Sequence, residues 1–189
     1  MSSNYTVIPE STFDNLQLNA GILLSSFDPS TGTVTDTNII TATTGGITVS
    51  CKPSFSDLGE DVDNCPNNMM ELKMLENWDC SMAFTALNTS PAAIKIALGC
   101  ATVNSSDSTR VDLDAPGAVA TARFSTIWWV GEKADGGYVA VELQNALSTE
   151  GFQLKTTKNG KGQVSVTITG HVSINAQDTM PMTFYSIDA

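Results

Sequence analysis

Residues 72–86 read LKMLENWDCSMAFTA and carry the clearest strand signal in the chain. Apolar side chains fall on one face of this stretch, at Leu72, Met74, Trp78, Cys80, Met82, Phe84 and Ala86. Polar side chains fall mostly on the other face, at Lys73, Asn77, Asp79, Ser81 and Thr85. Alternation with a period of two predicts a β-strand, and this one is longer than the average strand of about 5–6 residues. A strand of this length can protrude from its domain and pair elsewhere.

Weaker alternating patterns surround this stretch and predict further strands. They lie within residues 1–20 and at 39–52, 124–130, 138–143, 152–157, 163–172 and 182–185. Asn159-Gly160 separates two of these runs, and an Asn-Gly pair in that position is a strong hairpin signal. The sequence therefore predicts about eight strands arranged as a β-sandwich or a flattened barrel.

One short α-helix is expected between the strands. Ser90 suits the N-cap and Pro91 suits the first helical position. Residues 92–98 are short and apolar, and Gly99 is a plausible residue to end the helix. The expected role of this helix is to cover one face of the sandwich.

Residues 53–70 interrupt the alternation and form a predicted long acidic loop between two strands. Pro, Asn, Asp, Glu and Gly crowd into this stretch, and long loops inside compact domains are usually functional or disordered. No linker or internal repeat divides the chain. We therefore expect one domain over residues 1–189, with an N-terminal arm at 1–17, the acidic loop at 53–70 and a C-terminal tail at 175–189.

Composition narrows the classes of function. Charged residues make up 15% of the 189 residues and hydrophobic residues 41%, and this charged share is below the globular average of about 25%. Weakly charged surfaces are common where subunits meet. The formal net charge is −11, which disfavours binding to phosphate backbones because that needs clustered Lys and Arg. The first residues have neither a basic nor an apolar segment, so no signal peptide is expected, and no apolar run approaches the ~20 residues of a membrane helix.

The sequence carries none of the common catalytic or metal-binding motifs. His171 is the single histidine, and we expect it to be structural or exposed rather than catalytic. The cysteines have no Cys-x-x-Cys spacing, so they are expected to be free thiols rather than zinc ligands. The acidic groups at 57–63 and 112–114 match a calcium loop poorly. We expect no enzyme activity, no metal and no cofactor.

The dipeptide Trp128-Trp129 lies within a predicted strand. Neighbouring side chains in a strand point to opposite faces of the sheet. One indole can therefore enter the core, and the other is expected to be exposed or to meet a partner. Exposed tryptophans stack on sugars in some proteins, but subunit contact is the favoured use because aromatic residues anchor interfaces.

Several short stretches follow one another in an order that matches a known family. They are TGGITV at 44–49, GEDVDNCP at 59–66, EL at 71–72, NWD at 77–79, WWV at 128–130, VAVEL at 139–143, GF at 151–152 and GQVSVTITGH at 162–171. From Leu18 to Ile174 the chain resembles the major tail tube proteins of long-tailed bacteriophages of the Gram-positive type. The resemblance implies a β-sandwich flanked by one helix, in a non-enzymatic subunit that forms six-membered rings.

In that family the rings stack into a tube through which DNA leaves the virion, and the resemblance assigns roles to residues here. The acidic loop would reach the neighbouring ring, with Pro53, Asp57, Glu60, Asp61, Asp63, Asn64 and Asn67 as candidates. The helix would lie at a subunit contact, with Pro91, Ile94 and Leu98 as candidates. Trp128 and Trp129 are the aromatic interface candidates, and Asp79 and Glu142 are the acidic candidates for the lumen.

The resemblance also implies partners and a location. Copies of the same chain would be the main partner, together with a tape measure protein and a tail terminator. Double-stranded DNA would pass through without specific binding, helped by an acidic lumen that repels phosphate. The protein would assemble in the host cytoplasm and reside in the virion tail.

Two other functions fit the same sequence. The inner tube of a contractile tail or injection system would form the same rings and add a sheath as a partner. A carbohydrate-binding β-sandwich would explain the Trp pair and the Thr- and Ser-rich surface, and it would be a stable monomer.

Overall fold

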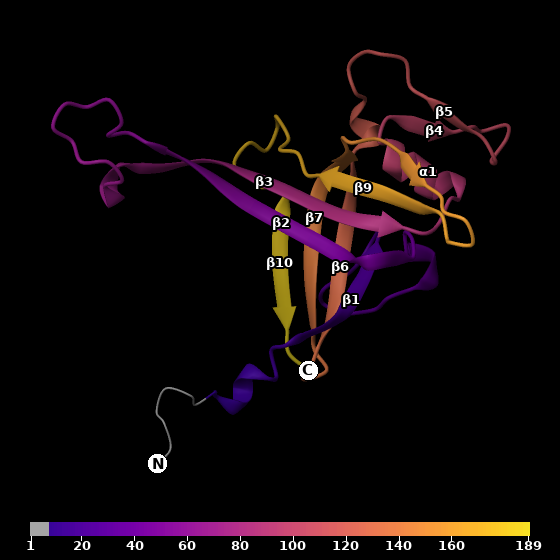
Figure 1. Ribbon diagram of the computed structural model, residues 1–189, viewed down its shortest axis with the longest axis horizontal. Coiled ribbons are helices and arrows are strands. Elements are labelled where there is room, and N and C mark those ends of the chain that lie inside the picture. The colour runs from indigo at the N-terminus through magenta and orange to yellow at the C-terminus, as the bar shows by residue number, and fades with distance from the viewer. Residues whose placement is uncertain (1–7) are drawn as a thin grey trace.

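Antiparallel strands dominate the computed structural model, which describes residues 8–189 and confirms the mainly β fold class. The ten strands of this region are β1 (Gln17–Leu24), β2 (Thr43–Asp57), β3 (Lys73–Ala86), β4 (Ala101–Val103), β5 (Val111–Leu113), β6 (Ser125–Lys133), β7 (Tyr138–Ser148), β8 (Gln153–Lys155), β9 (Gln163–Thr169) and β10 (Met182–Ile187). One α-helix, α1 (Pro91–Leu98), joins β3 to β4 (Figure 1). Short 3₁₀ turns occupy Glu10–Thr12, Asp36–Asn38, Met70–Leu72 and Thr121–Arg123.

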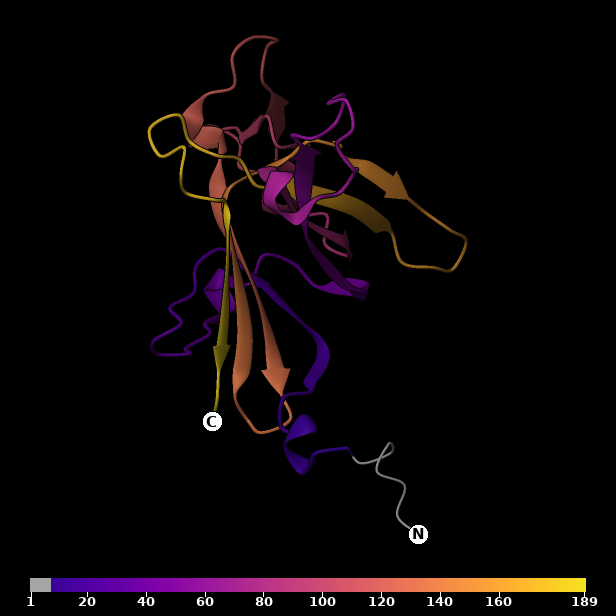
Figure 2. The ribbon, with the colours of Figure 1, turned by 90° about the vertical axis from the view of Figure 1, so that its left-hand side faces the viewer.

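The strands form two layers that share one strand. The first layer has the order β1-β6-β7-β10, and the second has β2-β3-β9, with β8 on the far side of β9. Strands of the first layer run across those of the second in both ribbon views (Figures 1 and 2). This is the sandwich that the alternating patterns predict.

Strand β7 belongs to both layers. Its first residues pair with β6 and β10, and its last two, Leu147 and Ser148, pair with β9. Asn145, whose φ is 47°, lies at an irregularity of the β6–β7 pairing two residues before the partners change. The Asn145 Nδ2 atom donates to the His171 carbonyl at 2.9 Å, and His171 Nδ1 lies 3.1 Å from the Asn145 carbonyl. These two contacts tie the histidine to β7 at this junction.

The main core lies between the two layers. Buried apolar side chains from both sheets meet there, and they include Leu23, Met82, Phe84, Ile127, Val141, Leu143, Val166, Ile168 and Met182. A second, smaller cluster lies on the opposite face of the β1-β6-β7-β10 sheet and contains Leu24, Phe27, Trp128, Val130 and Ala140. The segment after β1 covers this cluster, and the Tyr138 hydroxyl donates to the Pro29 carbonyl at 2.7 Å.

Helix α1 begins and ends where the sequence predicts. The Ser90 hydroxyl accepts a hydrogen bond from the Ala93 amide at 3.3 Å, and Pro91 occupies the first turn. Gly99 ends the helix with a φ of 72° and donates its amide to the Lys95 carbonyl at 3.0 Å. The Ala93 and Ala97 side chains face the sandwich and are buried.

Substituting Ser90 by Ala is expected to lower stability by about 1 kcal/mol, because the helix loses its N-cap acceptor. In a chain of this size that corresponds to a fall in Tm of roughly 2–4 °C. Thermal unfolding followed by circular dichroism measures the shift, and Ser90→Asp serves as the control because Asp also caps helices. Equal Tm values for wild type and Ser90→Ala would contradict the cap's contribution.

Three features differ from the sequence-based expectation. Residues 104–117 are polar and acidic and predict a loop, but β5 lies within them and pairs with β4, which directly precedes them. Strand β2 starts later than predicted and runs through Pro53 to Asp57, so the acidic loop begins at Leu58 instead of Pro53. Proline is tolerated here because β2 is an edge strand, where a missing N–H can face away from the sheet.

The C-terminal segment is anchored rather than loose. Strand β10 pairs with β7 along its whole length, and the buried Lys133 ammonium donates to the Asp188 carboxylate. This hydrogen bond raises the pKa of Lys133. The expected N-terminal arm lies partly at 1–7, outside the described residues, and its remainder leads into β1. Within residues 8–189, no helix is long and apolar enough to cross a membrane.

Candidate functional site

Strands β2 and β3 continue well beyond the sandwich as a two-stranded ribbon. Strand β9 pairs with β3 only from Ser81 to Ala86, whereas β2 pairs with β3 out to Asp57 opposite Lys73. We call residues 52–79 the arm, and residues 57–73 at its end the arm tip. Figure 1 shows the arm projecting to one side of the molecule. The long alternating stretch therefore does protrude from the domain.

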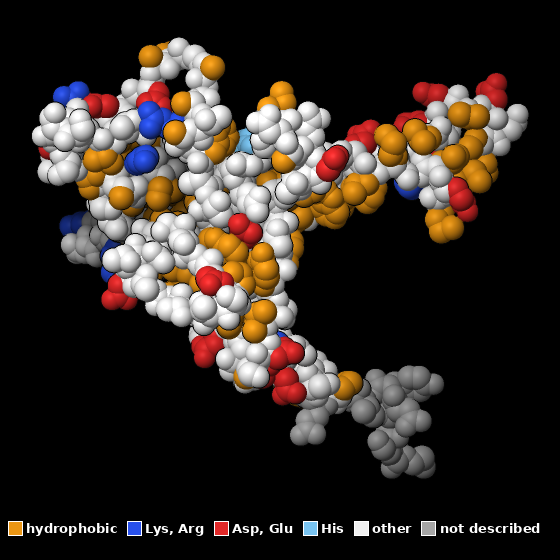
Figure 3. Space-filling model, turned by 180° about the vertical axis from the view of Figure 1, so that it is seen from behind, with side chains coloured by type: hydrophobic (Ala, Val, Ile, Leu, Met, Phe, Trp, Pro, Cys, Tyr) orange, Lys and Arg blue, Asp and Glu red, His pale blue; other side chains and the backbone are white. Residues whose placement is uncertain are grey.

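The arm exposes an unusual number of large apolar side chains. Those at least 39% exposed are Phe55, Leu58, Val62, Met69, Met70, Met74 and Leu75, and Met70 is 81% exposed. Seen from behind, hydrophobic side chains gather along the ribbon and at its end (Figure 3). Contiguous apolar surface of this kind marks an interaction site in soluble proteins.

The arm tip has its own hydrogen-bonded structure. The Asp57 carboxylate accepts from the Asn68 amide at 2.7 Å and the Gly59 amide at 3.0 Å, and the Lys73 ammonium lies 3.7 Å away. These interactions, led by the bond from Asn68, hold the pKa of Asp57 below its usual range. Asp61 and Asn64 have positive φ angles, which Asp and Asn tolerate better than most residues.

The candidates for an inter-ring contact all lie on the arm, but they are not equivalent. Pro53, Glu60, Asp61, Asp63, Asn64 and Asn67 are exposed. Asp57 is half-buried and its carboxylate is occupied by the backbone of the tip. Asp57 therefore shapes the tip, and the exposed residues are the ones available to a partner.

Stability is expected to fall as the pH drops below about 4, because hydrogen bonds hold several aspartates below their ordinary pKa of 3.8. The affected carboxyls are Asp28, Asp57, Asp107, Asp112 and Asp135. A carboxyl with a lowered pKa in the folded state stabilises the fold above its unfolded pKa, and this contribution is lost as the pH falls through the folded pKa. Tm measured from pH 7 to pH 2 checks the direction, and a Tm that rises below pH 4 would contradict it. Asp57→Asn is expected to flatten the decline.

Several sheet edges lack a partner in the described part of the chain. Strand β2 pairs only with β3, β8 only with β9, and β10 only with β7. Unpaired edges expose backbone donors and acceptors that can pair with another chain. Edges of both sheets are thus open to a second subunit.

The two tryptophans point to opposite faces, as predicted, but neither is exposed. Trp128 is 7% exposed and lies in the second cluster, where its ring packs against Phe27 and Tyr185. Trp129 is half-buried against the main core, and its Nε1 donates to the Ala20 carbonyl at 3.0 Å. The outer face of the sheet is covered at Trp128 by the segment after β1, and a contact of either indole with a partner stays a prediction.

The remaining candidates are scattered over the molecule. Asp79 is exposed at the base of the arm, opposite Lys52, whereas Glu142 is half-buried in the other sheet between Trp128 and Thr183. Helix residues Pro91, Ile94 and Leu98 are half-buried, on the side of the molecule away from the arm (Figure 1). The two acidic candidates are therefore not brought together within one subunit.

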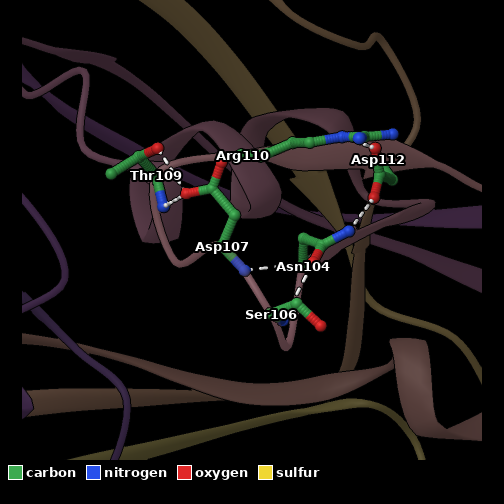
Figure 4. Close-up of polar contacts among 6 residues, drawn as sticks. All are labelled: Asn104, Ser106, Asp107, Thr109, Arg110 and Asp112. Carbon is green, nitrogen blue, oxygen red and sulfur yellow. Dashed lines mark hydrogen bonds and ion pairs between the residues drawn. The ribbon is translucent and has the colours of Figure 1, made fainter.

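The acidic loops outside the arm are held by internal contacts. In the turn between β4 and β5, Asp107 accepts from Thr109, and Asp112 accepts from Asn104 and Arg110 (Figure 4). Asp114 forms a two-bond pair with Arg123 at 2.5 and 2.6 Å. Across residues 8–189, no group of three or more His, Cys, Asp or Glu side chains is arranged to hold a metal.

All four cysteines are free, as expected, although only Cys80 is buried. Cys51 and Cys80 face each other across β2 and β3 with their sulfurs 3.4 Å apart. Burial, and then the contact with Cys51, raises the pKa of Cys80 to about 12. Cys80 is therefore a protonated core thiol at neutral pH.

No family model and no curated protein matches the sequence. The fold is similar to a chain of a solved structure described as the virion of native gene transfer agent (GTA) particle, with 8% sequence identity and a TM-score of 0.42. The match covers 88% of this chain and 95% of that chain.

Proposed function

We propose that this protein is a structural virion subunit that assembles into stacked hexameric rings and forms the tail tube of a bacteriophage. Its role is structural rather than catalytic, and its main partner is a second copy of itself. The tube conducts double-stranded DNA without binding it specifically, and its further partners are a tape measure protein and a tail terminator. The protein assembles in the host cytoplasm and resides in the virion tail.

The observation that carries this proposal is the apolar arm. A ribbon outside the sandwich cannot bury Phe55, Leu58 or Met70 against its own core. Completing the burial of one half-exposed Phe, Leu or Met side chain at a contact stabilises the assembly by roughly 1 kcal/mol. Seven such side chains on one projection supply a driving force for association that the monomer leaves unused.

The open sheet edges support the same conclusion. Edges of β2 and β8 lie on opposite sides of one sheet, and β10 ends the other. Pairing such edges between copies removes the exposed backbone groups. Contacts between two different surfaces of the same chain repeat head to tail, which generates rings or open stacks.

Sedimentation velocity over a wide concentration range, followed by negative-stain electron microscopy, tests the proposal. We expect annuli or tubes once the concentration is high enough. A protein that remains monomeric at every concentration would refute the tail tube role. A monomer that also binds a simple sugar on a glycan array would favour the carbohydrate-binding alternative.

A further inference from the structure

Three lysines are concentrated at the end of β8 and on the turn that joins it to β9. Lys155, Lys158 and Lys161 lie within seven residues, and the whole segment 153–163 contains no carboxylate. All three are exposed, and none of them has a carboxylate partner within 4.0 Å in the described part of the chain. The turn is held by a hydrogen bond from the Gly160 amide to the Thr157 carbonyl at 3.1 Å. It is a compact positive surface on a protein whose net charge is −11.

The arm tip has the opposite charge. Residues 57–73 contain five carboxylates and one lysine, a formal charge of −4. Lys73 is engaged by Asp57, and the other carboxylates, Glu60, Asp61, Asp63 and Glu71, are exposed. No Lys or Arg of the described residues lies within 4.0 Å of these four. Their mutual repulsion is left uncompensated in the monomer.

These two surfaces cannot meet within one molecule. The arm tip lies at one end of the longest axis and the β8–β9 turn lies towards the other (Figure 1). The view from behind shows Lys and Arg side chains mainly on the side away from the arm (Figure 3). Opposite charges at opposite ends are complementary only between copies.

Resting on the proposed self-assembly, we infer that the arm tip of one copy docks on the β8–β9 turn of a second copy. Lys155, Lys158 and Lys161 face the carboxylates of the tip in this contact. Leu154, which is 46% exposed on β8, meets the apolar side chains of the tip. Methionines such as Met70 suit this contact because their flexible side chains adapt to irregular surfaces.

A nucleic acid is the other possible ligand for a lysine cluster, and the observations favour a protein partner. Neutralising phosphates along a duplex needs a larger basic surface than three lysines, and the rest of the chain is acidic. The arm tip offers both a matching charge and an apolar surface to exclude water. The contact is heterologous, so it can be repeated indefinitely along a stack.

Charge reversal followed by mixing tests the contact. One variant carries Lys155→Glu, Lys158→Glu and Lys161→Glu, and the second carries Glu60→Lys, Asp61→Lys and Asp63→Lys. Each variant alone brings like charges together, so the concentration needed for assembly is expected to rise about tenfold or more. In an equal mixture, the acidic tip of the first variant can meet the basic turn of the second, and the basic tip of the second can meet the acidic turn of the first. Assembly is therefore expected to return near the wild-type concentration.

The matched control for the lysine variants is Lys95→Glu, compared with Lys158→Glu. Both substitutions change the net charge equally, and Lys95 is exposed on α1, away from both the turn and the arm. The control variant is expected to assemble like the wild type. Added salt is expected to reduce the difference between all variants, because it screens exposed charges.

The outcomes separate this contact from the general proposal. If the wild type assembles and both charge reversals assemble equally well, the contact is wrong and the tail tube role stands. If the mixture fails where each variant fails, the two surfaces are not partners. If the lysine reversal abolishes binding to a short DNA duplex but leaves assembly unchanged, the turn binds nucleic acid instead. A wild type that never assembles removes both proposals.

Discussion

Replacing Phe55–Glu76 by an Asn-Gly turn is expected to leave a folded subunit that no longer assembles. Ser54 and Asn77 face each other across β2 and β3, so a two-residue turn can join them. Asn-Gly favours the type I′ geometry that such hairpins need. On β3 the buried side chains of the main core begin at Cys80, beyond the deleted segment. The deletion therefore removes the exposed apolar surface and spares the sandwich.

Two measurements separate folding from assembly in this variant. Thermal unfolding is expected to give a Tm within a few degrees of wild type, and sedimentation velocity is expected to show monomers at concentrations where the wild type forms annuli. A milder variant combines Phe55→Ser, Met70→Ser and Met74→Ser. Its matched control combines Leu113→Ser, Val119→Ser and Ile174→Ser, which are also exposed apolar residues but lie outside the arm. A shortened chain that still forms annuli would show that the arm is not the driving surface.

Leu143→Ala is expected to be the most destabilising single substitution in the sandwich. Leu143 is fully buried near the middle of β7, opposite Ile127 on β6 and Met182 on β10. Its side chain also fills the space over Gly170, where an added Cβ would lie 2.6 Å from Leu143 Cδ1. Truncation of the side chain leaves a cavity between the two sheets, and the paired strands cannot easily move to fill it. The expected cost is about 2–5 kcal/mol, out of a total stability of about 5–15 kcal/mol for a typical domain.

Urea unfolding of the monomeric arm-deleted background measures this cost without interference from assembly. Leu154→Ala is the control, because Leu154 is exposed and surface substitutions usually change stability by less than about 0.5 kcal/mol. Similar unfolding midpoints for Leu143→Ala and Leu154→Ala would contradict the placement of Leu143 in the core.

Local patterns in the sequence were enough to predict most of the fold. The alternation in 72–86, the Asn-Gly turn at 159–160 and the Ser90-Pro91 helix start each correspond to an observed element. Strands β4 and β5 were missed because three residues are too few to show a period. Strand β2 was cut short at Pro53 because proline normally ends a strand, and its position on an edge became visible only in the sheet order.

The candidate site was predicted only in part, and the reason is physical. Met74 and Met82 fall on the same face of one alternating run, yet Met82 is buried and Met74 is 48% exposed. What separates them is the extent of β9, which covers β3 only from Ser81 onward. Trp128 is buried for a similar reason, since the segment that covers it lies far away in sequence. Local periodicity predicts which face is apolar, but long-range pairing decides which part of that face is covered.

The passage of β7 through both layers also determines how a pull on the arm spreads through the subunit. Tension applied at the arm enters β3, crosses the ladder to β9 and reaches Leu147 and Ser148. From there it continues along the same polypeptide backbone to the strands that hold β1 and β10. We therefore expect a load on the arm to reach both layers through β7.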